Sequence, residues 1–236
     1  MKVAIPSKGR PGKITSLDIF PKAYIFVEPQ DFEEYNKLYS RVINIKENDK
    51  GVSYVRNFIL KYFEKEKIIA IADDDITQMY KANTLLIKEQ VEEQLKLMED
   101  TMIRYDIAQV GVNTKSLAGL TNKTIDTKGK IINFTLLNIP LLEKHKIKYD
   151  YNLTLFEDVD LSISLLRVKL KILKYCKYGI DTYSYKNLDD TGRGTFWNTK
   201  NIKKNVDYIL EKHKGLVSFR KDKKRRPNFT VHWRRL

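Results

Sequence analysis

The chain has 236 residues, of which 42% are hydrophobic and 31% charged, and this composition excludes collagen-like, mucin-like and fully disordered proteins. Its apolar runs, such as residues 68–72, are far shorter than the roughly 20 residues of a membrane helix, and the N-terminus lacks an apolar signal core. The single cysteine, Cys176, cannot form an internal disulfide. We therefore expect a soluble globular protein of a reducing compartment.

The formal net charge of +14 lies entirely in the last third of the chain. Residues 1–165 hold 24 basic and 24 acidic residues, whereas residues 166–236 hold 20 and 6. The basic residues are densest in 221–226 and resume at Arg234 and Arg235. Such a one-sided field favours a polyanionic partner, which releases counterions when it binds. The alternative is a solvated face or a frayed tail.

Four short apolar runs in the first part of the chain predict buried strands at 3–5, 23–27, 42–45 and 68–72. Between the third and the fourth run, Val55, Ile59 and Phe63 recur every fourth residue and predict a helix over 51–64. Strands that alternate with helical crossovers predict an α/β fold, in which a mainly parallel central sheet carries helices on both faces.

Further along the chain, apolar residues at helical spacing predict helices over 87–102, 159–170 and 202–213, and Gly215 is suited to end the last one. Short apolar runs predict strands at 107–112 and 172–178. No internal repeat and no linker of Pro, Gly or Ser interrupts this order. We therefore expect a single domain over 1–236 with a basic C-terminal segment, roughly 214–236.

Polar residues follow the predicted strands at the edge where an open α/β sheet binds its ligands. After the first strand comes a turn with two cations, residues 6–11, which is suited to lie against a nucleotide or a phosphate. Glu28 follows the second strand, and Arg56 and Asn57 lie on the predicted helix after the third. A plain surface loop and an exposed helix arginine are the alternatives.

Asp73, Asp74 and Asp75 directly follow the buried run at 68–72. Three adjacent carboxylates repel one another unless a cation compensates them. Mg²⁺ and Mn²⁺ prefer such oxygen ligands and bridge to substrate phosphates. Because alternate residues of an extended chain point the same way, Asp73 and Asp75 can act together while Asp74 points elsewhere. The alternative is a solvated acidic turn.

Three carboxylates, Glu157, Asp158 and Asp160, stand at the start of the predicted helix over 159–170. Acidic residues at a helix N-terminus can simply be caps. The functional alternative is a general base that faces an acceptor hydroxyl. His232, one of only three histidines, lies in the basic segment, and taken alone it is more often structural than a ligand.

Taken together and in this order, the turn at 6–11, Arg56-Asn57, the Asp-x-Asp at 73–75, the pair Glu157-Asp158 and the late histidine resemble a GT-A fold glycosyltransferase over nearly the whole chain. The opening at 5–11, the helix start at 51–57 and the basic tail are most similar to the phage-type TET-associated glycosyltransferases.

The resemblance implies a nucleoside-diphosphate sugar donor, with a UDP-sugar as the first choice, and Mn²⁺ or Mg²⁺. The metal would be held by Asp73, Asp75 and His232. In inverting members Asp158, beside Glu157, takes the position of the catalytic base. The nearby Asp160 leaves this assignment open. A retaining reaction, in which Asp158 would position the substrate, is also open. The residues expected around the donor are Pro6, Ser7, Lys8, Arg10, Glu28, Arg56, Asn57, Asp73 and Asp74.

The resemblance also implies that the acceptor is a hydroxymethylated pyrimidine, 5-hydroxymethylcytosine first, in phage DNA within the cytoplasm of an infected bacterium, with no membrane partner. Phe219, Phe229 and Trp233 would stack on an exposed base or anchor the segment, and residues 185–197 would form a flexible loop near donor or acceptor. The cations expected to contact DNA phosphates are Lys221, Lys223, Lys224, Arg225, Arg226, Arg234 and Arg235.

Three other functions compete with this interpretation. One is a glycosyltransferase whose acceptor is a surface glycan, a lipid or a protein, and another is a nucleic-acid-binding domain without catalysis. The third is a two-metal nuclease, which usually needs more carboxylates on neighbouring strands than this chain offers.

Overall fold

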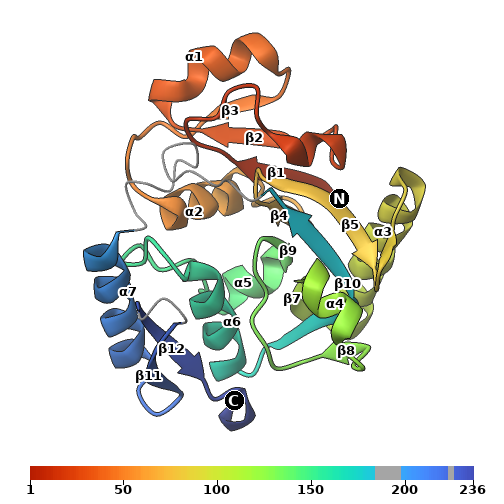
Figure 1. The fold of residues 1–236 in the computed structure, drawn as a ribbon. Coiled ribbons are helices and arrows are strands. Elements are labelled where there is room, and N and C mark those ends of the chain that lie inside the picture. Colours follow the sequence, from red (N-terminus) through yellow and green to blue (C-terminus); the bar gives the residue numbers. More distant parts are fainter. Residues whose placement is uncertain (184–197, 223–225) are drawn as a thin grey trace.

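The fold is built on one large sheet with helices on both faces (Figure 1). A computed structural model describes residues 1–183, 198–222 and 226–236. In these residues the sheet has ten strands, in the order β3-β2-β1-β4-β9-β7-β10-β5-β6 with β8 paired to β10. The strands are β1 (Lys2–Pro6), β2 (Tyr24–Val27), β3 (Val42–Asn44), β4 (Ile68–Ala72), β5 (Ile76–Lys81), β6 (Thr84–Leu85), β7 (Ile107–Thr114), β8 (Ile125–Asp126), β9 (Phe134–Asn138) and β10 (Lys171–Thr182).

The sheet is mixed, with most of its strands in one direction. The neighbours β3, β2, β1 and β4 pair in parallel, and so do β7 and β10. Between these two groups β9 runs antiparallel to both β4 and β7, and β5 runs antiparallel to β10. The carboxyl ends of β1, β2, β3, β4, β7 and β10 therefore lie at one edge of the sheet. The predicted α/β class is confirmed, and the reversed strands β5, β8 and β9 are additions that the sequence did not reveal.

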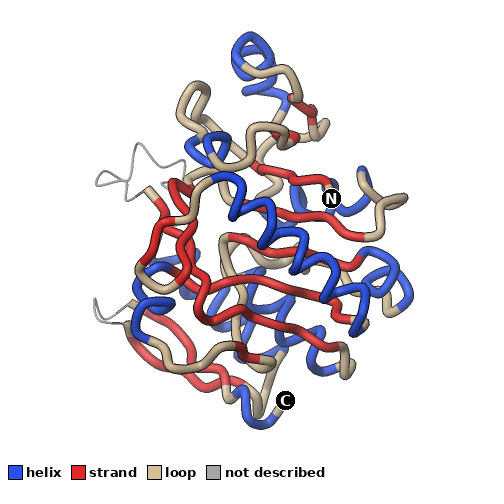
Figure 2. Tube along the Cα trace, turned by 90° about the vertical axis from the view of Figure 1, so that its right-hand side faces the viewer, coloured by secondary structure: helices blue, strands red, loops and turns tan. Residues whose placement is uncertain are grey.

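Helices cover the sheet on both sides, as Figures 1 and 2 show from two directions. Tyr35 of α1 and Met98 of α3 pack on one face, and Ile59 of α2 and Leu161 of α6 pack on the other. The helices are α1 (Pro29–Leu38), α2 (Val52–Tyr62), α3 (Lys88–Tyr105), α4 (Lys115–Leu120), α5 (Ile139–Lys144), α6 (Glu157–Arg167) and α7 (Thr199–Lys212), with 3-10 turns η1 (Thr15–Asp18) and η3 (Trp233–Arg235).

Strand β4 is apolar throughout because both faces of the sheet are covered at this strand. Ile68, Ala70 and Ala72 belong to the core on one face, and Ile69 and Ile71 belong to the core on the other, so every residue of the strand is buried. A strand covered on both sides has no polar position, which explains the sequence pattern.

The basic C-terminal segment folds as an antiparallel hairpin of β11 (Val217–Lys221) and β12 (Pro227–Val231). Val217 and Phe229 pack with Val206 and Ile209 of α7 and with Ile163 of α6 in a third core. Helix α7 ends at Lys212 with His213 as its cap, and Gly215, whose φ is +82°, then turns the chain into β11. None of the helices in the described ranges has the length and apolar character needed to cross a bilayer.

Ile71 tests the contribution of the central strand to stability. Its side chain is 1% exposed, so Ile71→Ala should leave a cavity and lower the free energy of unfolding by about 2–5 kcal/mol. Ile103→Ala removes the same atoms from a side chain that is 54% exposed, and it should change this free energy by no more than about 0.5 kcal/mol. Urea titrations measure both values, and equal losses would contradict the assignment of β4 as the buried centre.

Candidate active site

A cavity of about 590 Å³ lies at the edge where the parallel strands end. The turns after β1, β2 and β4 line it, together with the start of α6 and the segment that enters β9. The sequence predicted residues that bind the donor, hold the metal or take part in catalysis, and all but two of those described line this cavity. They are Pro6, Ser7, Lys8, Arg10, Glu28, Arg56, Asp73, Asp74, Asp75, Glu157 and Asp158, and the two that do not line it are Asn57 and His232.

Asp74 fixes the turn that follows β1. Arg10 Nη1 donates to Asp74 Oδ1 at 2.7 Å, and Ser7 Oγ donates to Asp74 Oδ2 at 2.6 Å. The Tyr35 hydroxyl lies 2.8 Å from Ser7 Oγ and accepts a hydrogen bond from the Arg10 amide at 2.8 Å. Burial raises the pKa of Tyr35, which keeps this hydroxyl protonated. The middle aspartate is therefore an anchor for the first loop.

Lys8 connects the loops that follow β1, β2 and β3. Its Nζ lies 2.8 Å from Glu28 Oε2 and also pairs with Asp49. Burial lowers the pKa of Lys8, but the hydrogen bonds and charges of these two carboxylates outweigh it and raise the pKa overall. Lys8 and Glu28 thus form a charged pair on the cavity wall.

Arg56 joins the strand edge to helix α6. Its side chain is 4% exposed, with Nη2 3.0 Å from Asp73 Oδ1 and Nη1 3.4 Å from Glu157 Oε1, and it also pairs with Asp158. Burial lowers the pKa of Arg56, but the charge of Glu157 and then of other groups raises it well above its usual value. Burial in turn raises the pKa of Glu157, and Arg56 opposes that rise. One guanidinium therefore forms ion pairs with three carboxylates.

The first turn of α6 places Glu157 and Asp158 on the cavity. The helix begins at Glu157, two residues earlier than expected, so both carboxylates benefit from the positive end of its dipole. The preceding residue, Phe156, has a φ of +67°, an unusual value for a bulky side chain. Its ring packs edge-on against Phe229 of the hairpin, with the ring centroids 5.2 Å apart. The hairpin thus supports the helix start.

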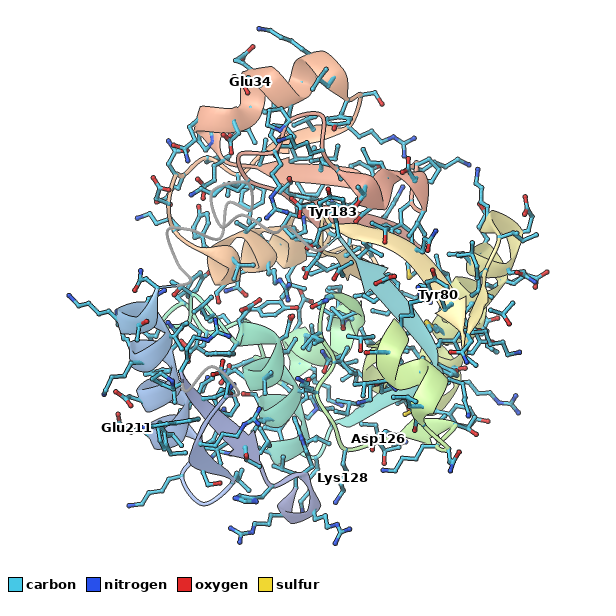
Figure 3. All side chains as sticks on the ribbon, in the orientation of Figure 1. Glu34, Tyr80, Asp126, Lys128, Tyr183 and Glu211 are labelled. Atoms are coloured by element: carbon cyan, nitrogen blue, oxygen red, sulfur yellow. The ribbon has the colours of Figure 1, made fainter. Side chains whose placement is uncertain are left out.

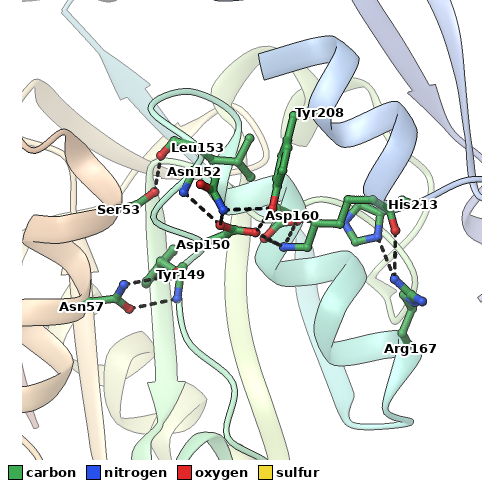
Figure 4. Close-up of polar contacts among 11 residues, drawn as sticks. Ser53, Asn57, Tyr149, Asp150, Asn152, Leu153, Asp160, Arg167, Tyr208 and His213 are labelled. Atoms are coloured by element: carbon green, nitrogen blue, oxygen red, sulfur yellow. Dashed lines mark hydrogen bonds and ion pairs between the residues drawn. The ribbon is translucent and has the colours of Figure 1, made fainter. Parts of the chain in front are cut away.

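Asp160 serves a different purpose from Asp158. His213 Nε2 and Lys212 Nζ each lie 2.8 Å from Asp160 Oδ1, and Lys212 Nζ also lies 2.7 Å from Asp150 Oδ2 (Figure 4). Burial would raise the pKa of Asp150, but hydrogen bonds from Lys212, the Asn152 amide and Tyr208 lower it to about 2. Asp160 ties α6 to α7 and does not line the cavity, so Glu157 and Asp158 are the α6 carboxylates that do.

Asn57 and its neighbours hold the loop that leads into α6. Asn57 Nδ2 donates to the Tyr149 carbonyl at 2.8 Å, and Asn57 Oδ1 accepts from the Tyr149 amide at 2.9 Å (Figure 4). Ser53 Oγ donates to the Leu153 carbonyl at 2.5 Å. Because the Tyr149 backbone accepts from its amide nitrogen and donates to its amide oxygen, Asn57 positions this loop.

Asp73 and Asp75 are the predicted metal ligands at the cavity. His232, the third, lies elsewhere: its Nε2 is 3.0 Å from Ser218 Oγ in the hairpin. Within the described ranges, no group of three or more His, Cys, Asp and Glu side chains is arranged to hold a metal ion. Mg²⁺ and Mn²⁺ usually complete their coordination with water and substrate phosphates. Two carboxylates therefore fit an ion that binds together with a diphosphate.

Several features of the cavity were not predicted. Lys130 and Asn133 line it because the unpredicted strand β9 carries them to the edge, and Thr182 lines it from the end of β10. The amide of Tyr183, a residue labelled in Figure 3, donates to the carbonyl of Asp75 at 2.7 Å, so the end of β10 lies beside the turn that follows β4. The predicted loop 185–197 falls outside the described residues.

The predicted DNA contacts lie on the hairpin and on η3. Lys221, Arg234 and Arg235 are exposed, and Arg235 Nη1 also donates to the Gly215 carbonyl at 2.8 Å. Arg226 is half-buried and pairs with Asp222 at 2.7 Å. Phe229 and Trp233 belong to the third core, and only Phe219 of the three predicted aromatics is exposed. Residues Lys223, Lys224 and Arg225 lie outside the described part.

Comparisons with known proteins agree with this geometry. A family model described as TET-Associated Glycosyltransferase matches residues 1–214. A search of curated proteins found no match.

Among solved structures, glucosyl-3-phosphoglycerate synthase from Mycobacterium tuberculosis, in complex with Mn²⁺, UDP and phosphoglyceric acid, is 13% identical, with a TM-score of 0.56 over 98% of this chain and 85% of that one. S. aureus TarS 1–349 with UDP-GlcNAc is 14% identical, with a TM-score of 0.53 over 89% and 67%. The same protein with UDP is 16% identical, with a TM-score of 0.51, and this chain spans 66% of its length. These likenesses concern the fold, and they confirm the predicted GT-A type architecture.

Arg56→Met tests the compensation of the three carboxylates. Their uncompensated burial should lower the free energy of unfolding at pH 7 by about 3–5 kcal/mol. Without the guanidinium the pKa values of these carboxyls rise in the folded state, so the folded variant binds protons that the unfolded chain does not bind. The loss should therefore be smaller at pH 5 than at pH 7.

Urea titrations at the two pH values measure this difference. The control is Arg41→Met, which removes an exposed guanidinium that donates to the Lys22 carbonyl, and its effect should be small at both pH values. An equal loss at pH 5 and pH 7 for Arg56→Met would contradict the role given to Arg56.

Proposed function

Because the chain belongs to the TET-associated glycosyltransferase family and is thus a glycosyltransferase, we propose that it transfers a sugar from a nucleoside-diphosphate sugar to the hydroxyl of a hydroxymethylated pyrimidine in DNA. The observation that carries this proposal is the cavity, where Asp73 and Asp75 at the end of β4 face the same space as Glu157 and Asp158 of α6. Two candidate ligands for a diphosphate-bound metal ion and a candidate base thus line the same cavity.

The donor side of the proposal rests on the turns after β1, β2 and β4. The turn from Pro6 to Arg10 is fixed by Asp74, and Lys8 adds a cation to the wall. A UDP-sugar is the first choice, since TarS is a structural neighbour that has been solved with UDP-GlcNAc. When bound by Asp73 and Asp75, Mn²⁺ or Mg²⁺ would act as a Lewis acid on the diphosphate leaving group.

In an inverting reaction, the acceptor oxygen forms a bond to the anomeric carbon while the bond from that carbon to the diphosphate breaks. We assign the acceptor proton to Asp158, with Glu157 beside it. Arg56 holds both carboxylates at the cavity and so orients the base. We do not assign this role to Asp160, because it does not line the cavity and instead joins α6 to Lys212 and His213.

The acceptor side of the proposal rests on charge. The 14 excess positive charges of the chain all belong to residues 166–236, which include the hairpin next to Phe156 of the cavity. Exposed Lys221 and Arg234 suit phosphates, which carry no base identity. A base that is modified inside a duplex must leave the stack to reach a cavity. On this proposal the enzyme works in the cytoplasm of a phage-infected bacterium.

A transfer assay tests the proposed function. The protein is incubated with Mn²⁺, a panel of nucleotide sugars and DNA that contains 5-hydroxymethylcytosine or 5-hydroxymethyluracil, and the digested nucleosides are analysed by mass spectrometry. We expect the mass of a sugar on the modified nucleoside, and no product after EDTA treatment. Asp158→Asn should lower the rate about 10²–10⁴-fold, because it removes the proton acceptor, and Asp75→Asn should also abolish transfer.

Asp100→Asn is the matched control, because it neutralises an exposed aspartate on α3. Wild-type rates for Asp158→Asn or Asp75→Asn would overturn the assigned roles. Hydrolysis of the sugar nucleotide without labelled DNA would move the acceptor to a glycan, a lipid or a protein.

The salt dependence of DNA affinity tests the hairpin surface. Each phosphate contact contributes about 0.9 to the slope of log affinity against log salt concentration for duplex DNA. The double variant Lys221→Gln, Arg234→Gln should therefore make this negative slope shallower by up to about 2. Fluorescence anisotropy with duplex DNA measures the slope. The control Lys37→Gln, Lys65→Gln changes two exposed lysines near α1 and α2, and it should leave the slope unchanged. An unchanged slope for the hairpin variant would argue against DNA contacts at these two residues.

A further inference from the structure

One cation of the cavity has a different environment from the others. Lys8, Arg10 and Arg56 also line the cavity, and each of them pairs with at least one carboxylate. Lys130 lines the same cavity but pairs with no carboxylate among the described residues. Its positive charge is therefore accessible to an anionic ligand, whereas the other three cations are paired with carboxylates of the protein.

The surroundings of Lys130 are cationic. The side chain of Lys130 remains exposed to solvent; its partial burial, and then the charges of Lys174 and Arg220, lower its pKa. Lys130 belongs to the turn between β8 and β9, Lys174 to β10 and Arg220 to β11. Three segments far apart in the sequence therefore bring positive charge to one place, and like charges that repel one another are relieved by a bound anion.

Contacts within the protein fix this group of cations. Lys174 Nζ donates to the Lys130 carbonyl at 3.4 Å and lies 3.8 Å from Asp126 Oδ2. Arg220 Nε donates to the Phe229 carbonyl at 2.9 Å. A Cβ atom at Gly129 would lie 2.8 Å from Asp126 Oδ2 and 3.1 Å from Lys174 Nζ, so the backbone of the turn packs directly against the Asp126–Lys174 pair. Asp126 and Lys128 mark this turn in Figure 3.

The same group lies between the reaction site and the hairpin. Three residues beyond Lys130, the Asn133 carbonyl accepts a hydrogen bond from the Asp73 amide at 2.8 Å. On the other side, Arg220 is bound to the backbone of Phe229, whose ring contacts Phe156 at the cavity. Positive charge thus continues from the exposed hairpin to the cavity wall near the carboxylates.

We propose that Lys130, with Lys174 and Arg220 behind it, forms an anion site that binds a phosphodiester of the acceptor next to the nucleotide that enters the cavity. This inference rests on the proposed function and adds to it the part of the acceptor that is recognised. The ligand chemistry is a phosphate oxyanion, which the acceptor backbone and the donor diphosphate both contain. The acceptor is the better match, because the group continues into the hairpin.

The kinetic test uses Lys130→Met with two acceptors, an oligonucleotide with one hydroxymethylated pyrimidine and the free hydroxymethylated nucleoside, which has no phosphate. We expect kcat/KM for the oligonucleotide to fall about 10-fold through a higher KM, with unchanged transfer to the nucleoside and an unchanged KM for the donor. Lys130→Arg should retain most of the activity. Lys128→Met, in the same turn, is the matched control and should behave as wild type.

A neutral methylphosphonate beside the target nucleotide provides a second arm. It should reproduce the loss with the wild-type enzyme and add little to the loss of Lys130→Met, because both changes remove the same contact. Equal losses with oligonucleotide and nucleoside would overturn the proposal. So would a higher KM for the donor, which would identify the donor diphosphate as the ligand.

A binding measurement separates this inference from the proposed function. If the wild-type enzyme hydrolyses the donor but modifies no DNA, the acceptor in the proposed function is wrong. Anisotropy with a single-stranded oligonucleotide still tests Lys130, because Lys130→Met should weaken binding and lower the salt slope by about 0.7. Unchanged affinity and slope would overturn the anion site whether or not transfer occurs.

Discussion

The arrangement of the site depends on how two buried arginines compensate the carboxylates at one edge of the sheet. Asp73 and Asp74 follow β4, while Glu157 and Asp158 come from α6 some eighty residues later in the chain. Without cations these carboxylates would repel one another, and burying their charge would be costly. Arg10 compensates Asp74, and Arg56 compensates the other three. The same ion pairs that stabilise the edge also set the distance between the Asp-x-Asp turn and α6.

Periodicity revealed the elements whose apolar pattern is strong. The continuous run of β4 and the four-residue spacing in α2 are examples, and both elements lie close to their predicted bounds. Helix α1 was missed although Pro29 marks its start, since Tyr35 is its only buried residue and leaves almost no stripe. Strand β9 was missed because only Phe134, Leu136 and Leu137 of its five residues are apolar, which leaves neither a continuous run nor a strict alternation. In the hairpin, the dense charge concealed the alternation that buries Val217 and Phe229.

At the site, the sequence identified the residues that follow strands, because parallel strands bring their carboxyl ends to one edge. It did not distinguish between neighbours on a helix. Arg56 and Asn57 are adjacent, yet one lines the cavity and the other binds the Tyr149 backbone. Asp158 and Asp160 differ in the same way, and the partner that separates them, His213, is more than fifty residues away. Such distinctions depend on tertiary contacts that no local pattern contains.

The reversal of β9 gives the cavity two kinds of wall. Most of the cavity comes from loops that leave parallel strands, but the wall with Lys130 and Asn133 comes from a segment that enters an antiparallel one. This segment is nevertheless tied to the Asp-x-Asp turn, because the Asn133 carbonyl accepts a hydrogen bond from the Asp73 amide and Phe134 pairs with Ala72 of β4. A change in the length of this segment would therefore displace the Asp-x-Asp turn together with the wall that carries Lys130.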